Sequence, residues 1–371
     1  MAAGRSSTSV CALFRCANSS LLPLSLASAG IDGWISSRRR NDPVITRREV
    51  LLLGGVGLVA AHPLSRGQAV SATRRVGVLL TQSQATSAHL RAAFSQAMHD
   101  LGWLEGKNVE YRMVYADGDV DRLDALVNGL ITQNVEVVVA SSSATTRAAQ
   151  RATKTIPIVM VAVSNAVESG FVATLAKPGG NITGVSNQRE EALGKLIGIL
   201  HEVLPGAQRI AVLLNDRNVA YASLWAAAQS TCAALGLVAF RIVASVRDDL
   251  GTAITQIVRR QSQAVVVVPD PVYLNERTKL QELMLATRLP AAYGLREHVV
   301  AGGLLSYAAD LAGNYRAAAT YVDRILKGAR PAELPIEQPT KYELLINLRT
   351  AKELGLTIPP SVLVRADEVI R

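Results

Sequence analysis

The chain has 371 residues, of which 49% are hydrophobic but only 4% aromatic, so its core must be built mainly from Ala, Val, Leu and Ile. Its formal net charge is +9, and a large part of the excess lies in the arginine-rich segment 1–72. The scattered charge of the remainder does not favour nucleic-acid binding. Only Cys232 follows this segment, which excludes an intrachain disulfide in the rest of the chain.

Segment 1–72 has the pattern of an export signal. Arg47 and Arg48 precede an apolar run, Val50 to Ala61, that is shorter than the ~20 residues needed to cross a bilayer. The stretch around the two arginines resembles the twin-arginine signal. We therefore expect residues 1–72 to hold a disordered extension and a twin-arginine-like signal, cleaved near residues 69–72, and the mature protein to be periplasmic.

From Arg75 onward, strands alternate with helices. The pattern predicts four strands, at Arg75–Leu80, Asn108–Tyr115, Val135–Ala140 and Ile158–Val163. It also predicts four helices: His89–Leu101, Asp119–Gln133, one that begins at Ala144 and another that runs through Leu175. Short β-branched runs of this kind are typical of strands buried on both faces of a parallel sheet. Alternating strands and helices indicate a doubly wound α/β architecture.

The same pattern then begins again. Arg209–Leu214 repeats Arg75–Leu80, and Leu235-Gly236 repeats the Leu101-Gly102 helix stop at the same offset along the chain. Further strands at 237–243 and 264–268 flank a helix at 248–260. The repeat predicts two similar parallel-sheet lobes.

The carboxyl ends of the strands carry polar loops, where open α/β sheets bind ligands. The candidate ligand-binding residues at these ends are Thr81, Gln82, Ser142, Ser143, Ala144, Thr145, Ser164 and Asn165 in the first lobe, and Asn215, Asp270 and Tyr293 in the second. Two lobes facing each other would form a cleft that closes on a small ligand.

Each candidate has a structural alternative. Residues 142–145 offer hydroxyls and helix N-terminal N–H groups to a carboxylate, but they also fit a plain helix cap. Asp270 could pair with a ligand ammonium or cap a turn. Asn165 and Asn215 could bind polar ligand groups or form Asx turns, and the ring of Tyr293 could line the cleft.

No recognised catalytic or metal motif is present. The chain lacks a Gly-x-Ser-x-Gly elbow, a phosphate loop with Lys and a His-Glu-x-x-His sequence. A hydrolase based on Ser142 would need a histidine, and none follows a predicted strand directly; His298 comes nearest. We expect no enzymatic activity, no metal and no cofactor.

Several longer stretches resemble a known family. They are Leu101–Val109, Leu175–Gly184, Ala301–Tyr307, Ala319–Gly328 and Gln338–Leu348 with its continuation to Pro360. Across Arg75–Arg371 the chain resembles ABC-transporter substrate-binding proteins of the type I periplasmic-binding fold, in the subgroup related to tryptophan and tyrosine binders. The loops at 142–143 and 165–166 depart from the usual Thr-Pro and Asp-Pro of that family, which leaves the ligand open.

The resemblance implies two lobes joined by a three-segment hinge. We expect residues 73–183 and 303–331 in lobe 1, and residues 184–302 and 332–371 in lobe 2. It further implies a monomeric receptor that captures a small amino-acid-like or carboxylate ligand and presents it to an inner-membrane ABC permease. A sensor without a transport role is the alternative. The export signal stands where a repressor of this fold would carry its DNA-binding helices, so we expect no nucleic-acid partner.

Overall fold

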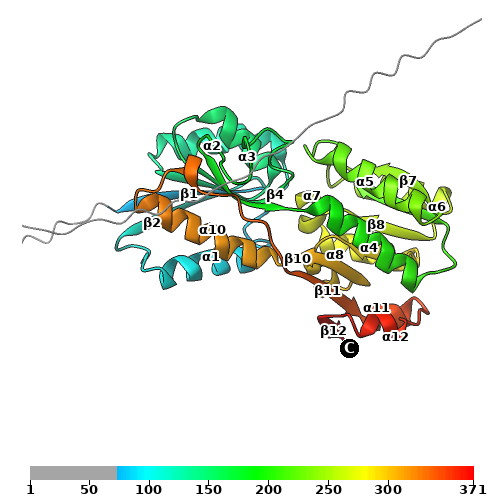
Figure 1. The fold of residues 1–371 in the computed structure, drawn as a ribbon. Coiled ribbons are helices and arrows are strands. Elements are labelled where there is room, and N and C mark those ends of the chain that lie inside the picture. Colours follow the sequence, from blue (N-terminus) through cyan, green and yellow to red (C-terminus); the bar gives the residue numbers. More distant parts are fainter. Residues whose placement is uncertain (1–72) are drawn as a thin grey trace, which may run out of the picture. The chain divides into compact units, whose positions relative to one another are not determined.

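Two sheets organise residues 73–371, the part of the chain that this computed structural model describes (Figure 1). The predicted extension, signal and cleavage site in residues 1–72 lie outside these residues. Lobe 1 contains the five-stranded sheet, whose strands are β1 (Arg74–Leu80), β2 (Val109–Tyr115), β3 (Val137–Ala140), β4 (Ile158–Ser164) and β5 (Ile182–Asn187). Lobe 2 contains the seven-stranded sheet, whose strands are β6 (Arg209–Leu214), β7 (Val238–Val243), β8 (Ala264–Val267), β9 (Ala291–Tyr293), β10 (Leu305–Ala309), β11 (Tyr342–Asn347) and β12 (Glu368–Ile370).

The sheet topology confirms the internal repeat. Lobe 1 has the strand order β2-β1-β3-β4-β5, and lobe 2 contains the corresponding order β7-β6-β8-β9-β10, with neighbouring strands parallel in both. Lobe 2 then adds β11, antiparallel to β10, and β12, parallel to β11. The predicted α/β fold with two similar parallel sheets is therefore correct.

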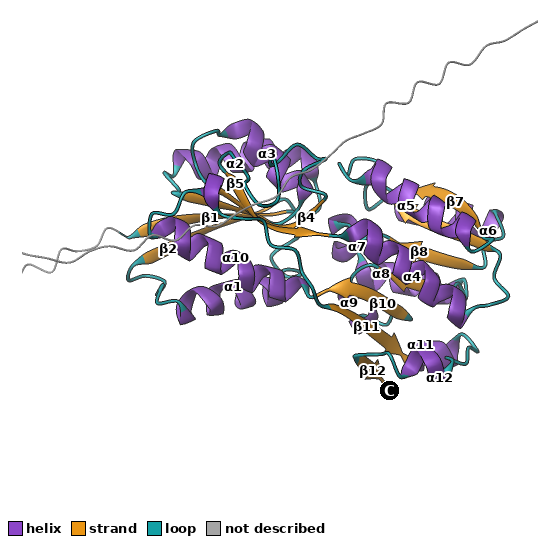
Figure 2. Ribbon diagram, in the orientation of Figure 1, coloured by secondary structure: helices purple, strands orange, loops and turns teal. Residues whose placement is uncertain are grey.

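Helices cover both faces of each sheet (Figure 2). Those of the first half are α1 (Ala88–Asp100), the 3-10 turn η1 (Val120–Arg122), α2 (Leu123–Thr132), α3 (Ser143–Ala152) and α4 (Arg189–Val203). They are followed by α5 (Tyr221–Ala234), α6 (Asp249–Arg259), α7 (Pro271–Asn275), α8 (Arg277–Ala286), α9 (Arg296–Val300), α10 (Leu311–Leu326), the 3-10 turn η2 (Pro331–Glu333), α11 (Leu348–Glu353) and α12 (Pro360–Leu363).

The lobes exchange one helix each. After β5 the chain leaves lobe 1, and α4 packs against α5 and β10 of lobe 2. After β10 the chain returns, and α10 packs against α1, β4 and β5 of lobe 1. Tyr315, Ala318 and Val322 on α10 belong to the same buried cluster as Leu90 and Phe94 on α1. Each lobe thus completes its core with a helix that follows the other lobe's sheet.

The chain crosses between lobes later than the sequence predicts. β5 stays paired with β4 as far as Asn187, and β10 stays in the seven-stranded sheet as far as Ala309. Glu337 still pairs beside Val185 before the third crossing. The predicted boundaries at 183/184, 302/303 and 331/332 are therefore too early.

The helix predicted to run through Leu175 is absent. Residues 165–181 form turns and irregular structure, beginning at Asn165 with a φ of 47°. The apolar side chains of Phe171 and Val172 are buried in the core of lobe 1 without forming a helix. Arg147 of α3 holds this segment: its guanidinium lies over the Phe171 ring at 4.4 Å and donates to the carbonyl of Ser169.

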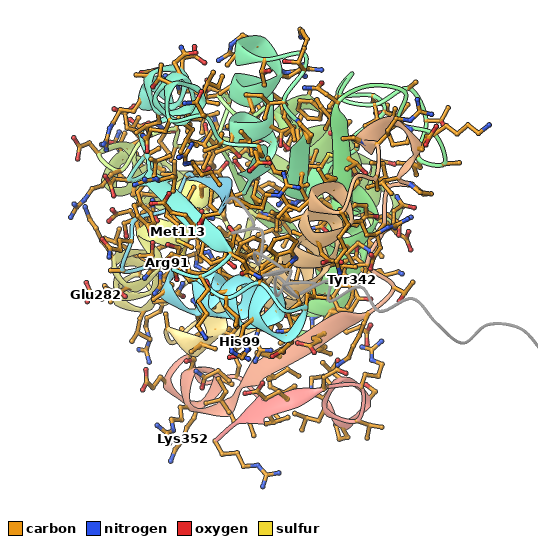
Figure 3. All side chains as sticks on the ribbon, turned by 90° about the vertical axis from the view of Figure 1, so that its left-hand side faces the viewer. Arg91, His99, Met113, Glu282, Tyr342 and Lys352 are labelled. Atoms are coloured by element: carbon orange, nitrogen blue, oxygen red, sulfur yellow. The ribbon has the colours of Figure 1, made fainter. Side chains whose placement is uncertain are left out.

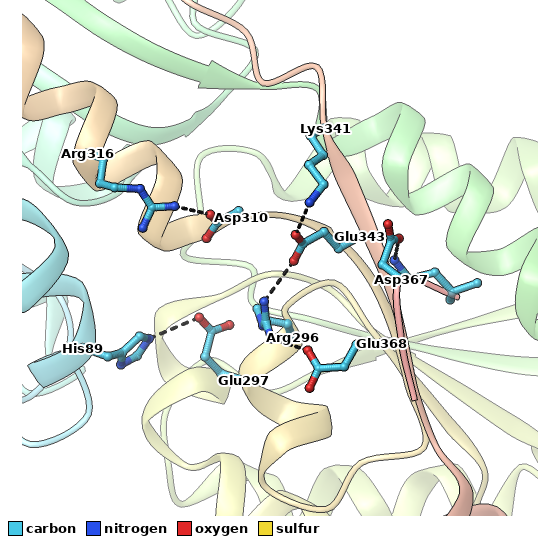
Figure 4. Close-up of polar contacts among 10 residues, drawn as sticks. His89, Arg296, Glu297, Asp310, Arg316, Lys341, Glu343, Asp367 and Glu368 are labelled. Atoms are coloured by element: carbon cyan, nitrogen blue, oxygen red, sulfur yellow. Dashed lines mark hydrogen bonds and ion pairs between the residues drawn. The ribbon is translucent and has the colours of Figure 1, made fainter. Parts of the chain in front are cut away.

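Charged side chains lie along the crossing segments (Figure 4). Asp310 accepts from Arg316 at 2.6 Å, and Glu343 accepts from both Lys341 (2.8 Å) and Arg296 (2.9 Å). The Nε2 atom of His89 on α1 lies 3.3 Å from Oε1 of Glu297 on α9, so this pair links the two lobes. The carboxylates of Glu297 and Glu343 are largely buried, with 11% and 14% of their side chains exposed, whereas their basic partners are more exposed.

Aromatic packing also marks the third crossing. Tyr342 opens β11 (labelled in Figure 3) and its ring stacks on Tyr307 of β10, with the centroids 5.6 Å apart. Its hydroxyl accepts from the backbone N–H of Gln188, in the first crossing segment. Within residues 73–371, no helix combines the length and the apolar character that a membrane span requires.

Candidate functional site

A pocket lies where the carboxyl ends of strands from both sheets meet. Lobe 1 contributes Thr81, Gln82, Val120, Ser141, Ser142, Ser143, Ala144 and Ala162, and α10 contributes Leu311. Lobe 2 contributes Arg189, Asn215, Arg217, Asn218, Pro269, Asp270, Pro271, Val272, Leu274 and Leu295. The cavity volume is about 40 Å³, which is room for a few water molecules.

The lobe 1 wall is built by the cap of α3. Ser142 accepts from the backbone N–H of Thr145, and the Thr145 hydroxyl accepts in turn from the backbone N–H of Ser142 at 2.8 Å. The Ser142 hydroxyl also lies 2.8 Å from that of Thr81, at the end of β1. The predicted N-cap is therefore real, and it fixes the loop in place.

The cap leaves two backbone donors free beside the pocket. In α3 the first two backbone N–H groups belong to Ser143 and Ala144, both of which line the pocket. The part of the chain that the structure describes supplies no acceptor for either group. The positive end of a helix dipole lies at the same point. A capped helix start and an anion site are thus compatible in this loop.

The lobe 2 wall is organised around Asp270, which is only 2% exposed. One carboxylate oxygen accepts from the N–H of Val272 at 2.9 Å and from Asn215 at 3.1 Å, and the other accepts from Asn218 at 2.8 Å. Burial raises the pKa of Asp270, and these three donors partly oppose the rise. Asp270 is therefore both a helix cap and the buried acid of the pocket.

Arg189 is the main pocket residue that the sequence analysis missed. It is the first residue of α4, and its guanidinium donates to the carbonyl of Ala162 in lobe 1 (2.9 Å) and of Pro269 in lobe 2 (3.2 Å). Desolvation lowers its pKa, while the charge of Asp270 acts in the opposite direction. A cation in the first turn of a helix opposes the helix dipole, and this was the available signal in the sequence.

The structure places the eleven predicted site residues in two groups. Those that line the pocket are Thr81, Gln82, Ser142, Ser143, Ala144, Asn215 and Asp270. Thr145, Ser164, Asn165 and Tyr293 lie elsewhere. The hydroxyl of Thr145 is engaged by the backbone of Ser142 in the cap of α3. The side chain of Asn165 donates to Glu168. Ser164 is fully buried at the end of β4, where its N–H lies 3.4 Å from the Ser143 hydroxyl.

The prediction for Tyr293 is corrected most clearly. Its ring is buried in lobe 2 and stacks on His298, with the centroids 4.9 Å apart. Its hydroxyl donates to Gln281, which contacts His298 in turn. The strand β9 is only three residues long, and Tyr293 projects from it into the core and not toward the pocket. His298 is buried in the same core.

Direct contacts between the lobes surround the pocket. Arg217, after β6, pairs with Asp121 of η1, and the side chain of Asn275 accepts from the N–H of Ser83 (3.3 Å) and the hydroxyl of Thr86 (2.8 Å). Residues 73–371 hold no cluster of three or more potential metal ligands. The pocket lining contains no histidine.

Comparisons with known proteins find similar chains. The chain is 24% identical, over 72% of its length and 76% of the relative, to a tyrosine-binding protein of Clostridioides difficile (strain R20291). A conserved domain protein of Vibrio cholerae is 26% identical with a TM-score of 0.76, and the match covers 80% of this chain and 99% of that one. A domain from Streptococcus pneumonia, solved in complex with L-Trp, is 22% identical with a TM-score of 0.75 and covers 81% and 100%.

Structural neighbours of this kind have the type I periplasmic-binding fold. The family model for ABC transporter substrate binding proteins matches residues 75–370, which is almost the whole described chain. The chain belongs to the ABC transporter substrate-binding protein family.

Proposed function

We propose that the protein is the periplasmic receptor of an ABC importer and captures a small amino-acid-like or carboxylate ligand between its lobes. The observation that carries this proposal is the pocket itself, whose lining comes from both lobes and combines free helix N–H groups, a buried acid and a guanidinium. A zwitterion or carboxylate matches these groups. The tyrosine-binding relative and the L-Trp complex support the amino-acid class.

The mechanism follows from the position of the pocket. A ligand that touches both walls binds the closed arrangement better than an open one, so it shifts the population toward closure. The closed form is then what an inner-membrane permease recognises. Three crossing segments allow the lobes to rotate about a hinge while each sheet stays intact. The receptor acts as a monomer, without a cofactor, metal or catalytic step.

A ligand screen tests the proposal. Thermal-shift measurements with amino acids, aromatic acids and other small carboxylates should find a stabilising solute. Calorimetry should then show that Ser142→Ala combined with Asp270→Ala weakens its binding by several kcal/mol. The exposed pair Ser230→Ala with Asp248→Ala serves as the matched control and should leave affinity unchanged. No stabilisation by any solute, together with measurable turnover of one of them, would favour an enzyme.

Export is tested separately. Arg47→Lys combined with Arg48→Lys should leave the protein in the cytoplasm, because the twin-arginine receptor reads the arginine pair. N-terminal sequencing of the exported protein should give a start near residues 70–73. An active exported protein that retains its leader would contradict this part of the proposal.

A further inference from the structure

Polar contacts that join the two lobes outside the pocket differ in how they respond to pH. They include Arg217 with Asp121, Asn275 with Ser83 and Thr86, and His89 with Glu297. An arginine and a carboxylate both stay charged near neutral pH, and the contacts of Asn275 involve no ionisable side chain. The third contact contains an imidazole, and histidine is the side chain whose charge normally changes between pH 5 and pH 8.

The His89–Glu297 pair joins the start of α1 in lobe 1 to α9 in lobe 2 (Figure 4). The side chain of Glu297 is 11% exposed, whereas that of His89 is 47% exposed. Oε1 of Glu297 faces the imidazole, and its Oε2 has no hydrogen-bond partner among residues 73–371. A largely buried carboxylate gains more from a nearby positive charge than a solvated one does, because less water screens the attraction. The imidazole itself remains open to protons from solvent.

The other charged groups beside the pair have partners of their own. A cavity of about 470 Å³ next to the pair is also lined by Arg277, Arg296 and Asp310. Their partners are, in that order, the carbonyl of Leu274, the carboxylates of Glu343 and Glu368, and Arg316 of α10. Arginine and carboxylate side chains normally keep their charge between pH 8 and pH 6. The histidine is therefore the group in this cluster that changes charge over that range.

The charge of the imidazole determines the direction of the effect. A protonated ring forms an ion pair between the lobes, whereas a neutral ring forms only a weaker hydrogen bond. Opening the lobes separates α1 from α9 and loses this contact. The closed arrangement therefore gains stability while the ring is protonated, and this gain is lost as the pH rises and the ring becomes neutral.

We propose that His89 and Glu297 form a pH-sensitive latch that favours the closed arrangement of the lobes under mildly acidic conditions. The latch rests on the hinge motion of the proposed receptor function, and it adds that the protein binds its solute more tightly at pH 6 than at pH 8. Because the imidazole is half exposed, the ratio of closed to open protein should rise only about two- to fivefold between pH 8 and pH 6.

Single-molecule fluorescence energy transfer on the purified full chain, without ligand, tests the latch. Dyes attached at Ala125→Cys on α2 and Ala222→Cys on α5 report the separation of the lobes, since both positions are exposed. Cys11→Ser and Cys16→Ser remove the cysteines of residues 1–72, and Cys232 is buried. The ratio of closed to open protein should be about two- to fivefold higher at pH 6 than at pH 8.

Variants of the latch separate the charge of the ring from its shape. His89→Gln should remove the pH response, and His89→Lys, which keeps a positive charge, should hold the high ratio at both pH values. The control His99→Gln, on the same helix and beside Asp100, should respond to pH like the unmodified protein. Asp121→Asn breaks a contact without an imidazole, so it should lower the ratio equally at both pH values.

Two results would overturn the latch. One is an equal ratio of closed to open protein at pH 6 and pH 8, and the other is a pH response that His89→Gln leaves intact. Because no ligand is present, these results do not depend on which solute binds. Failure of the receptor function would appear instead as no stabilisation by any solute in the thermal-shift screen.

Discussion

The two lobes share a scaffold but present different chemistry to the pocket. In lobe 1 the loop after β3 caps its helix with the neutral hydroxyl of Ser142, and in lobe 2 the loop after β8 caps its helix with the carboxylate of Asp270. Corresponding strands thus deliver unlike groups to the same cleft. The repeat determines where the site lies, whereas the residues at each loop decide what each wall can bind.

A second difference concerns buried ionisable groups. Lobe 2 buries Asp270 and His298 and partly buries Arg189, while the polar side chains that lobe 1 buries at the pocket include the hydroxyls of Thr81, Ser141, Ser142 and Ser143. The stability of lobe 2 should therefore depend on pH more strongly than that of lobe 1. The lobe 1 wall is held by hydroxyls that do not titrate in the physiological range.

The largest expected effect comes from a substitution that disrupts the sheet of lobe 1. Gly184 in β5 has a φ of +124°, and a Cβ there would overlap the carbonyl oxygen of Met160 in β4. Gly184→Ala should lower the free energy of unfolding by more than about 4 kcal/mol. Gly180→Ala, where a Cβ meets nothing within 4 Å, is the control. Equal urea midpoints for the two variants would show that β5 tolerates the change.

The next prediction compares the two caps. Asp270→Ala leaves three donors without their acceptor, so it should destabilise the protein by about 3 kcal/mol. Ser142→Ala removes a single neutral cap and should cost about 1 kcal/mol. Urea denaturation without ligand measures both. A larger loss of stability from Ser142→Ala than from Asp270→Ala would contradict the view that the lobe 2 wall depends more strongly on its cap.

A smaller expected effect is the pH dependence of stability that lobe 2 contributes through His298. Burial, aided by the charge of Arg277, lowers the pKa of His298 to about 3, so the folded protein keeps this ring neutral while the unfolded chain protonates below pH 6.5. The stability that this residue supports is present above pH 6.5 and is lost as the pH falls toward 3. Between pH 7 and pH 5 the loss should be about 2 kcal/mol.

Denaturation curves at the two pH values check this. His298→Gln should lose about 2 kcal/mol less than the wild-type protein, because its unfolded chain has no ring to protonate at this position. The exposed control His99→Gln should behave like the wild type. Identical pH dependence in wild type and His298→Gln would mean that the ring titrates normally in the folded state.

Much of the fold could be predicted from the sequence because it rests on local patterns. The β-branched runs identify the strands, and the constant offset that relates Arg75–Leu80 to Arg209–Leu214 identifies the repeat. The crossing points could not be placed, because the glycines near them reflect close backbone approach, as at Gly184, and not the end of a strand. The segment 165–181 is apolar enough for a helix but is held in turns by a tertiary contact with Arg147.

The candidate site was predicted in part for the same reason. Loops that follow strands directly, such as Ser142–Ala144 and Asp270, could be found from strand ends alone. Arg189 could not, because it reaches the pocket only after the chain has changed lobes. Tyr293 was misplaced because a three-residue strand gives no reliable alternation from which to tell its buried face.

Hydrogen exchange with and without the ligand found in the solute screen tests the central claim most directly. If one ligand bridges two unlike walls, saturating ligand should slow exchange both at residues 143–144 of lobe 1 and at residues 215–220 and 270–275 of lobe 2. The amides of Ser143 and Ala144 should change most, because they lack acceptors within residues 73–371. Protection confined to one lobe, with the ligand fully bound, would contradict the account.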